Sequence, residues 1–111
     1  MRRAFAALLL IPTIAQAKPS RLEQAHAAQQ SWGDCVVINT RKMSARAQPS
    51  DVVEAAFGKC FHEEGDFREA LRKWSNNGGW SIGYSGPELD YQMLRVRAQI
   101  RQQAMAAAVA G

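Results

Sequence analysis

Two cysteines, two histidines and a short acidic run carry the side chains of this sequence that could do chemistry. Cys35 and Cys60 are the only cysteines, and His26 and His62 are the only histidines. The acidic run HEEGD begins with His62 and covers residues 62–66. Thiols, imidazoles and carboxylates can hold a metal ion, support nucleophilic catalysis or, for two thiols, form a disulfide bond. Their spacing decides among these uses.

The spacing of the histidines and acids does not favour a metal site. A structural zinc site wants about four ligands, and the chain has no CxxC pair. His62 and Asp66 stand four residues apart, but Asp66 takes the place of the second histidine of the helical zinc motif. We therefore predict no bound metal and no cofactor. The acids Glu63, Glu64, Asp66 and Glu69 are interpreted as a solvated helix face, with a divalent-metal or acid-sensing role as the alternative.

No set of residues indicates a catalytic site. A nucleophilic cysteine needs a base beside it, and neither histidine is placed by the sequence pattern to serve. The serines have no visible histidine and carboxylate partners, and the four acids lie too close together to form a glycosidase pair. We predict that the protein is not an enzyme.

The first residues predict export. Arg2 and Arg3 precede an apolar run over residues 4–11, and Ala15-Gln16-Ala17 places small residues where a signal peptidase reads. The run is too short to span a membrane. We predict a Sec-type bacterial signal peptide over residues 1–17, cut between Ala17 and Lys18, and a single helical domain over residues 18–111 in the periplasm or outside the cell. No later run predicts stable membrane insertion.

Removal of this leader weakens any case for nucleic-acid binding. The full chain has 14 Lys and Arg against 10 Asp and Glu, and two of the basic residues lie in the leader, which leaves 12. Nucleic-acid binders usually concentrate basic residues on one face. Here only Arg95, Arg97 and Arg101 cluster, and no aromatic residues alternate with them. We therefore expect no nucleic-acid partner.

Periodicity predicts an all-α fold of three helices. Ser20 and Glu23 fit a capping box that opens a helix over 20–45. Pro49 ends it, and Ser50 can cap a second helix over 50–75, continuous or kinked at Gly65. The split at Gly65 into two helices is the alternative. An asparagine and glycine stretch then ends this helix, and a third helix runs over 87–108. The apolar stripe of the second helix is Val53, Phe57, Cys60, Glu64, Phe67, Leu71 and Trp74.

The cysteines predict a disulfide bond across the first two helices. An exported protein reaches a compartment where disulfides persist. Cys35 and Cys60 lie at nearly equal distances from the turn at 47–49, so an antiparallel pair of helices brings them to the same height. Both fall on inward-facing stripes. Trp32, one turn before Cys35, is then expected to pack in the core, beside Phe61 and Glu64 from across the hairpin.

Two features could bind a partner. Trp80 and Tyr84 lie in the glycine-spaced loop WSIGYSG, where they either close the open end of the hairpin or contact another protein. The third helix carries a second apolar stripe beside its core stripe, formed by Tyr91, Leu94, Ala98 and Met105. That stripe could meet a partner or a second copy of the chain in a homodimer.

Three functions are compatible with these observations. The first is an exported, non-enzymatic helical protein that binds another protein. The second follows from a resemblance: the chain resembles small periplasmic acid-stress chaperones in size, compartment, helical content, a single disulfide and a tryptophan close before the first cysteine. In that family the cysteines lie further apart. The resemblance implies that acid, by protonating the cluster at residues 62–69, exposes apolar surface that protects clients. The third is a small metal-binding protein or enzyme built on His62.

Overall fold

The computed structural model describes residues 18–76 and 86–110, and these residues form four α-helices and no strand. The all-α prediction is therefore confirmed, whereas the expected number of three helices is wrong. The difference arises within the second predicted helix, which divides in two. The helices are α3 (Arg21–Met43), α4 (Pro49–Lys59), α5 (Phe61–Trp74) and α6 (Gly86–Ala110).

The start of α3 follows the sequence signal. The Ser20 hydroxyl oxygen accepts from the Glu23 backbone N–H at 3.1 Å, and Glu23 Oε1 accepts from the Ser20 N–H at 2.7 Å. This reciprocal capping box satisfies two N–H groups that the helix itself cannot pair. The hydrogen bond from the Ser20 backbone lowers the pKa of the exposed Glu23 carboxyl, because it stabilises the charged form.

The residue that caps the start of α4 differs from the predicted one. Pro49 is the first residue of the helix, and Gln48 holds the cap position without a side-chain hydrogen bond. Proline suits the first helical turn because its missing N–H would have had no partner there. Ser50 therefore lies inside the helix and is not its cap.

The break between α4 and α5 falls at Cys60 and not at Gly65. Cys60 has φ −104° and ψ 22°, and its N–H is shared between the carbonyl oxygens of Ala56 and Phe57, each at 3.1 Å. A single residue thus leaves the helical conformation, and the Glu64 N–H still bonds to the Cys60 oxygen at 3.1 Å. Gly65 continues α5 without interruption. The predicted continuous helix over 50–75 is therefore wrong, and so are the kink at Gly65 and the alternative split there.

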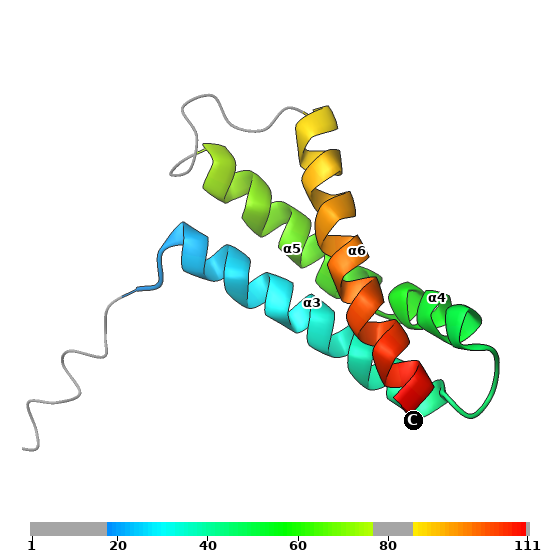
Figure 1. The fold of residues 1–111 in the computed structure, drawn as a ribbon. Coiled ribbons are helices and arrows are strands. Elements are labelled where there is room, and N and C mark those ends of the chain that lie inside the picture. Colours follow the sequence, from blue (N-terminus) through cyan, green and yellow to red (C-terminus); the bar gives the residue numbers. More distant parts are fainter. Residues whose placement is uncertain (1–17, 77–85, 111) are drawn as a thin grey trace, which may run out of the picture.

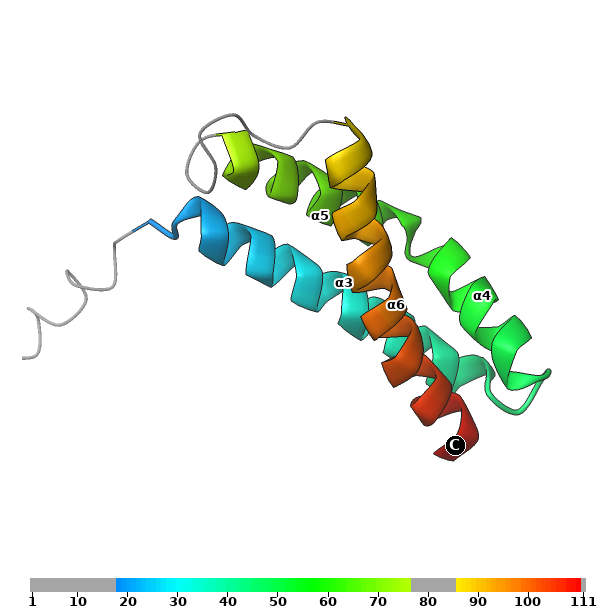
Figure 2. The same cartoon turned by 45° about the horizontal axis from the view of Figure 1, so that its top comes forward.

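The bend at Cys60 lets both shorter helices follow α3. Figures 1 and 2 show α4 and α5 running antiparallel to α3 and meeting at an angle, while α6 crosses the hairpin diagonally. Two straight helices that cross diverge on either side of the crossing. With the bend, α4 packs on the C-terminal part of α3 and α5 on its N-terminal part, and α6 contacts all three.

The core gathers around Trp32, as predicted, but with different neighbours. Trp32 is fully buried, and its ring centre lies 6.1 Å from that of Phe57 and 5.8 Å from that of Phe67. Phe61, expected beside it, is 69% exposed because the break at Cys60 turns the next residue outward. The other buried apolar residues include Val36, Val53, Ala56, Leu71, Leu89, Met93, Ile100 and Ala104.

None of the four described helices is long and apolar enough to cross a membrane. The predicted leader, residues 1–17, lies outside the described residues, as do Trp80 and Tyr84. Lys18, on the other side of the predicted cut, is exposed.

Candidate functional site

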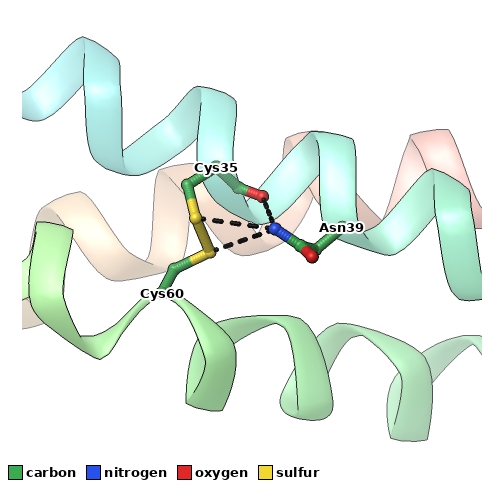
Figure 3. The surroundings of a disulfide bond; sticks show 3 residues. All are labelled: Cys35, Asn39 and Cys60. Atoms are coloured by element: carbon green, nitrogen blue, oxygen red, sulfur yellow. Dashed lines mark hydrogen bonds between the residues drawn. A yellow bond between two sulfur atoms is a disulfide. The ribbon is translucent and has the colours of Figure 1, made fainter.

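Cys35 and Cys60 form the predicted disulfide bond. Their Cα atoms lie 6.0 Å apart, and the bond joins the middle of α3 to the bend between α4 and α5 (Figure 3). Cys60 is fully buried and Cys35 partly so. Neither sulfur is a thiol in this state, so neither serves as a nucleophile or as a thiolate ligand for a metal.

Asn39 fixes the surroundings of the bridge. Its amide nitrogen donates to the Cys35 carbonyl oxygen at 2.9 Å and lies 3.6 Å from each sulfur atom (Figure 3). Asn39 stands one turn after Cys35 on α3, so the helix itself sets this contact. The amide spans the two helices at the point where they are covalently joined, which is a structural role.

One group of potential metal ligands exists within the described residues. It combines the two bonded cysteines with Glu63, whose atoms lie within 4.8 Å of one another. Because the two sulfurs are bonded to each other, the only ligand that this group offers a metal ion is the Glu63 carboxylate. His62 and Asp66 are both exposed, and the His62 ring packs edge-on against Phe61 at 5.9 Å.

Two acids of the cluster, Glu64 and Glu69, face different arginines. Glu69 accepts two hydrogen bonds from Arg72 on its own helix, at 2.6 and 3.0 Å, and these bonds lower the pKa of the Glu69 carboxyl and raise that of Arg72. Glu64 instead faces α6, where Arg97 lies 3.8 Å away. The four acids therefore do not form one continuous site.

Arg97 is the centre of the contact between α6 and the hairpin. Its guanidinium lies 4.0 Å above the Phe57 ring and reaches Glu54 at 3.5 Å, in addition to Glu64. Arg101 also pairs with Glu54, and Arg68 of α5 pairs with Asp90 of α6 at 2.6 Å. Carboxylates on α4, α5 and α6 thus meet arginines across the helix boundaries. These ion pairs lie at the surface, beside a groove of about 250 Å³ between α5 and α6.

A second stripe of α6 carries exposed apolar side chains and borders the Arg97 contacts, since Leu94 also lines the groove between α5 and α6. Tyr91 is 60% exposed, Leu94 65% and Val109 73%, whereas Met93 and Ile100 on the inner side are buried. We call Tyr91, Leu94, Ala98, Met105 and Val109 the outer face of α6. The first four are the second stripe predicted from the sequence, although Met105 is partly buried and packs against the core.

Comparison with protein-family models, curated proteins and solved structures finds no match for this chain.

A second groove, of about 430 Å³, lies between α3 and α6. Six of its eight lining residues are polar, and four of these are glutamines. This groove was not expected from the sequence, because its residues are separated by about 70 positions and only the crossing of α3 and α6 brings them together.

Arg97 was also missed as an individual residue, although a signal for it exists. It follows Met93 by four positions and precedes Ile100 by three, so it shares the border of their buried stripe. An arginine at such a border can pack its stem and planar head over apolar surface while its charge reaches solvent. Phe57 and Glu54 also lie one turn apart on α4.

Proposed function

We propose that this chain is an exported, non-enzymatic helical protein that binds another protein through the outer face of α6, in the periplasm or outside the cell. The exposure of that face carries the proposal. Tyr91 and Leu94 sit one turn apart, both at least 60% exposed, on a helix whose other stripe already completes the core.

The residue types of this face suit a protein partner. Tyrosine and arginine are among the side chains that most often dominate the binding energy of protein interfaces. Arg95 lies with its guanidinium 6.0 Å from the Tyr91 ring centre, so these two side chains form one amphipathic patch beside Leu94. Burying a leucine or tyrosine side chain against a partner contributes about 1.5–3 kcal/mol before the costs of association.

Export is supported by the disulfide and by the leader pattern together. Disulfides persist in oxidising compartments and are rare in the cytosol. A small domain whose buried residues gather around one tryptophan also benefits from a covalent link between its helices.

Sedimentation of the purified chain without residues 1–17, across a range of concentrations, tests whether the partner is a second copy. A homodimer through the outer face predicts a mass that doubles with concentration, and Leu94→Ser should shift that transition at least tenfold upward. Ile38→Ser is the matched control, because Ile38 is a 48% exposed apolar residue on α3. A monomer at every concentration excludes the homodimer and directs the search to a different protein.

An acid-stress chaperone is the second candidate, and the ion pairs of α6 favour it. Glu54, Glu64 and Asp90 each face an arginine across a helix boundary. Acid that protonates these carboxylates removes the pairs, while the disulfide keeps α3 joined to the other two helices. Detachment of α6 would then expose buried apolar residues such as Met93 and Ile100.

An aggregation assay separates this candidate from the first. The chaperone function predicts that the protein suppresses aggregation of a denatured client at pH 3 and not at pH 7. The double variant Glu54→Gln, Glu64→Gln should show protection at a higher pH than the wild type. Absence of protection at pH 3, with helical content retained, excludes the chaperone function and leaves the outer face of α6 as the proposed binding surface.

A further inference from the structure

The polar groove between α3 and α6 has the composition of a site for a small hydrogen-bonding ligand. Figure 2 shows α6 crossing α3. The groove lies between these two helices. From α3 it is lined by His26, Gln29, Gln30 and Asp34, and from α6 by Gln99 and Gln103. Its volume of about 430 Å³ falls in the range of roughly 300–1,000 Å³ typical of small-molecule sites.

A glycine sets the depth of the groove. Gly33 lies on the α3 wall, where a Cβ atom would stand 3.7 Å from Ile100 Cγ1 and 4.0 Å from Gln103 Oε1. A methyl group fits there in ordinary contact, whereas a longer side chain at this position would project between the two helices and occupy the space. Gly33 therefore keeps the groove open along its α3 wall.

The lining selects against apolar and anionic ligands. An apolar ligand would cover amide groups without offering them hydrogen bonds, which costs about 1–3 kcal/mol for each group left unpaired. Asp34 contributes a carboxylate, and no lysine or arginine lines the groove in the described part of the chain. A phosphate or carboxylate ligand would thus meet the like charge of Asp34 and no lysine or arginine.

The same lining matches a hydroxyl-bearing ligand. Each glutamine amide offers two donors and an acceptor, and a hydroxyl can donate to one group and accept from another. Gln30 Nε2 donates to Asp34 Oδ1 at 3.1 Å, so this pair is held in place on α3 and still presents a second carboxylate oxygen and an amide oxygen as acceptors. The groups of α6 face the pair from the other wall.

We propose that this groove binds a small, hydroxyl-rich molecule of one or two sugar rings that carries no negative charge. The inference rests on a different surface from the outer face of α6 and does not depend on its partner. Weak, millimolar binding is expected, because the groove is open and no phenylalanine, tyrosine or tryptophan among the described residues lines it for stacking.

A series of three hexoses tests the charge and the chemistry of the ligand together. Glucose, glucosamine and glucose 6-phosphate share one ring and differ in charge. Titration of the full mature chain, followed by NMR of the glutamine side-chain amides, should show saturable shifts with glucose. Glucosamine should bind at least as tightly because of Asp34, and glucose 6-phosphate at least tenfold more weakly.

Single substitutions test whether the residues that line the groove bind the sugar. Gln103→Ala should weaken glucose binding about two- to tenfold, the effect of losing one hydrogen bond, and Gly33→Leu should abolish it. Gln102→Ala is the matched control, since Gln102 is an exposed neighbour on α6 that does not line the groove. Helical content is measured for each variant by circular dichroism.

Three results would overturn the proposal. The first is an absence of saturable shifts of the groove amides with glucose and glucosamine up to solubility. The second is binding of glucose 6-phosphate as tight as that of glucose. The third is equal sensitivity to Gln102→Ala and Gln103→Ala, which would mean that the sugar contacts the surface of α6 without using the groove.

Discussion

The guanidinium of Arg97 lies 4.0 Å above the Phe57 ring, so a cation from α6 covers an aromatic ring of α4. Phe57 in turn packs edge-on against Trp32 of α3. Three helices are thus connected through a chain of three side-chain contacts, and the carboxylates of Glu54 and Glu64 lie 3.5 and 3.8 Å from the guanidinium. This arrangement attaches α6, the helix with the proposed binding face, to the disulfide-linked hairpin.

Replacing Arg97 should therefore loosen α6. Arg97→Ala is expected to lower the free energy of unfolding by about 1–2 kcal/mol, from the lost stacking and partly exposed ion pairs. Arg97→Lys should lose about half as much, since it keeps the charge without the planar head. Arg95→Ala, on the solvent side of the same helix, should change stability by less than about 0.5 kcal/mol. Urea unfolding measures all three, and equal losses for Arg95 and Arg97 would contradict this role.

Thr40→Val should stabilise the protein. Thr40 is fully buried on α3, and its hydroxyl has no hydrogen-bond partner among the described residues. Valine has nearly the same shape, so the substitution removes the cost of an unpaired polar group, about 1 kcal/mol, without opening a cavity. Thr40→Ser, which keeps the hydroxyl and loses the methyl group, should destabilise. A lower melting temperature for the valine variant would show that the hydroxyl has a partner.

Gly65→Ala should also stabilise, and it tests the position of the break. Gly65 lies inside α5, and a Cβ added there meets no atom within 4 Å. Alanine in a helix interior is favoured over glycine by about 1 kcal/mol. The same change at Gly58 meets no atom either but lies in the last turn of α4, where the gain should be smaller. Destabilisation by Gly65→Ala would indicate that the chain breaks or bends at this residue.

Loss of the disulfide should cost about 3 kcal/mol. The bridge closes a loop across 25 positions, and a loop of this size restricts the unfolded chain by that amount. The double variant Cys35→Ser, Cys60→Ser and the reduced wild-type protein should unfold at similar urea concentrations, both below that of the oxidised protein. Alkylation of both cysteines without reductant, in protein taken from an oxidising compartment, would show that no bridge forms.

The capping box predicts part of the acid sensitivity. The pKa of Glu23 is lowered in the folded state by Ser20, so its contribution to stability is complete above the unfolded value of about 4.5 and is lost as the pH falls through the folded value. Glu23→Gln retains an acceptor for the Ser20 N–H but does not titrate. Its stability should therefore decline less between pH 5 and pH 3 than that of the wild type. Identical declines, measured by urea unfolding, would argue against this contribution.

Features set by neighbours in the sequence could be predicted, and features set by packing could not. The capping box, the limits of α3 and the end of α5 follow from local hydrogen bonding and glycine placement. The disulfide could be predicted from the position of the turn and from periodicity, because a small bend changes neither. The break at Cys60 could not be predicted, because a single residue leaves the helix and the apolar stripe from Phe57 to Phe67 keeps its phase. Local propensity indicated Gly65, where packing requires no break.

Of the candidate surfaces, too, some could be predicted from local sequence and others could not. The outer face of α6 is a single stripe on one helix, so its periodicity was visible in the sequence. The glutamine-lined groove and the contacts of Arg97 join residues from separate helices. Their existence depends on the angle at which α6 crosses the hairpin, which no local pattern specifies.

Photo-crosslinking in the exporting cell tests the central claim, protein binding through the outer face of α6, most directly. A photoreactive amino acid replaces Leu94 in the chain expressed with its own leader, and Ile38 on α3 is replaced in the control. Mass spectrometry then reads the products in the periplasm and the medium. We predict a chain that begins at Lys18 and is two hydrogens lighter than its reduced form. We also predict one discrete protein adduct from position 94 and none from position 38. Uncrosslinked monomer from both positions would contradict the claim.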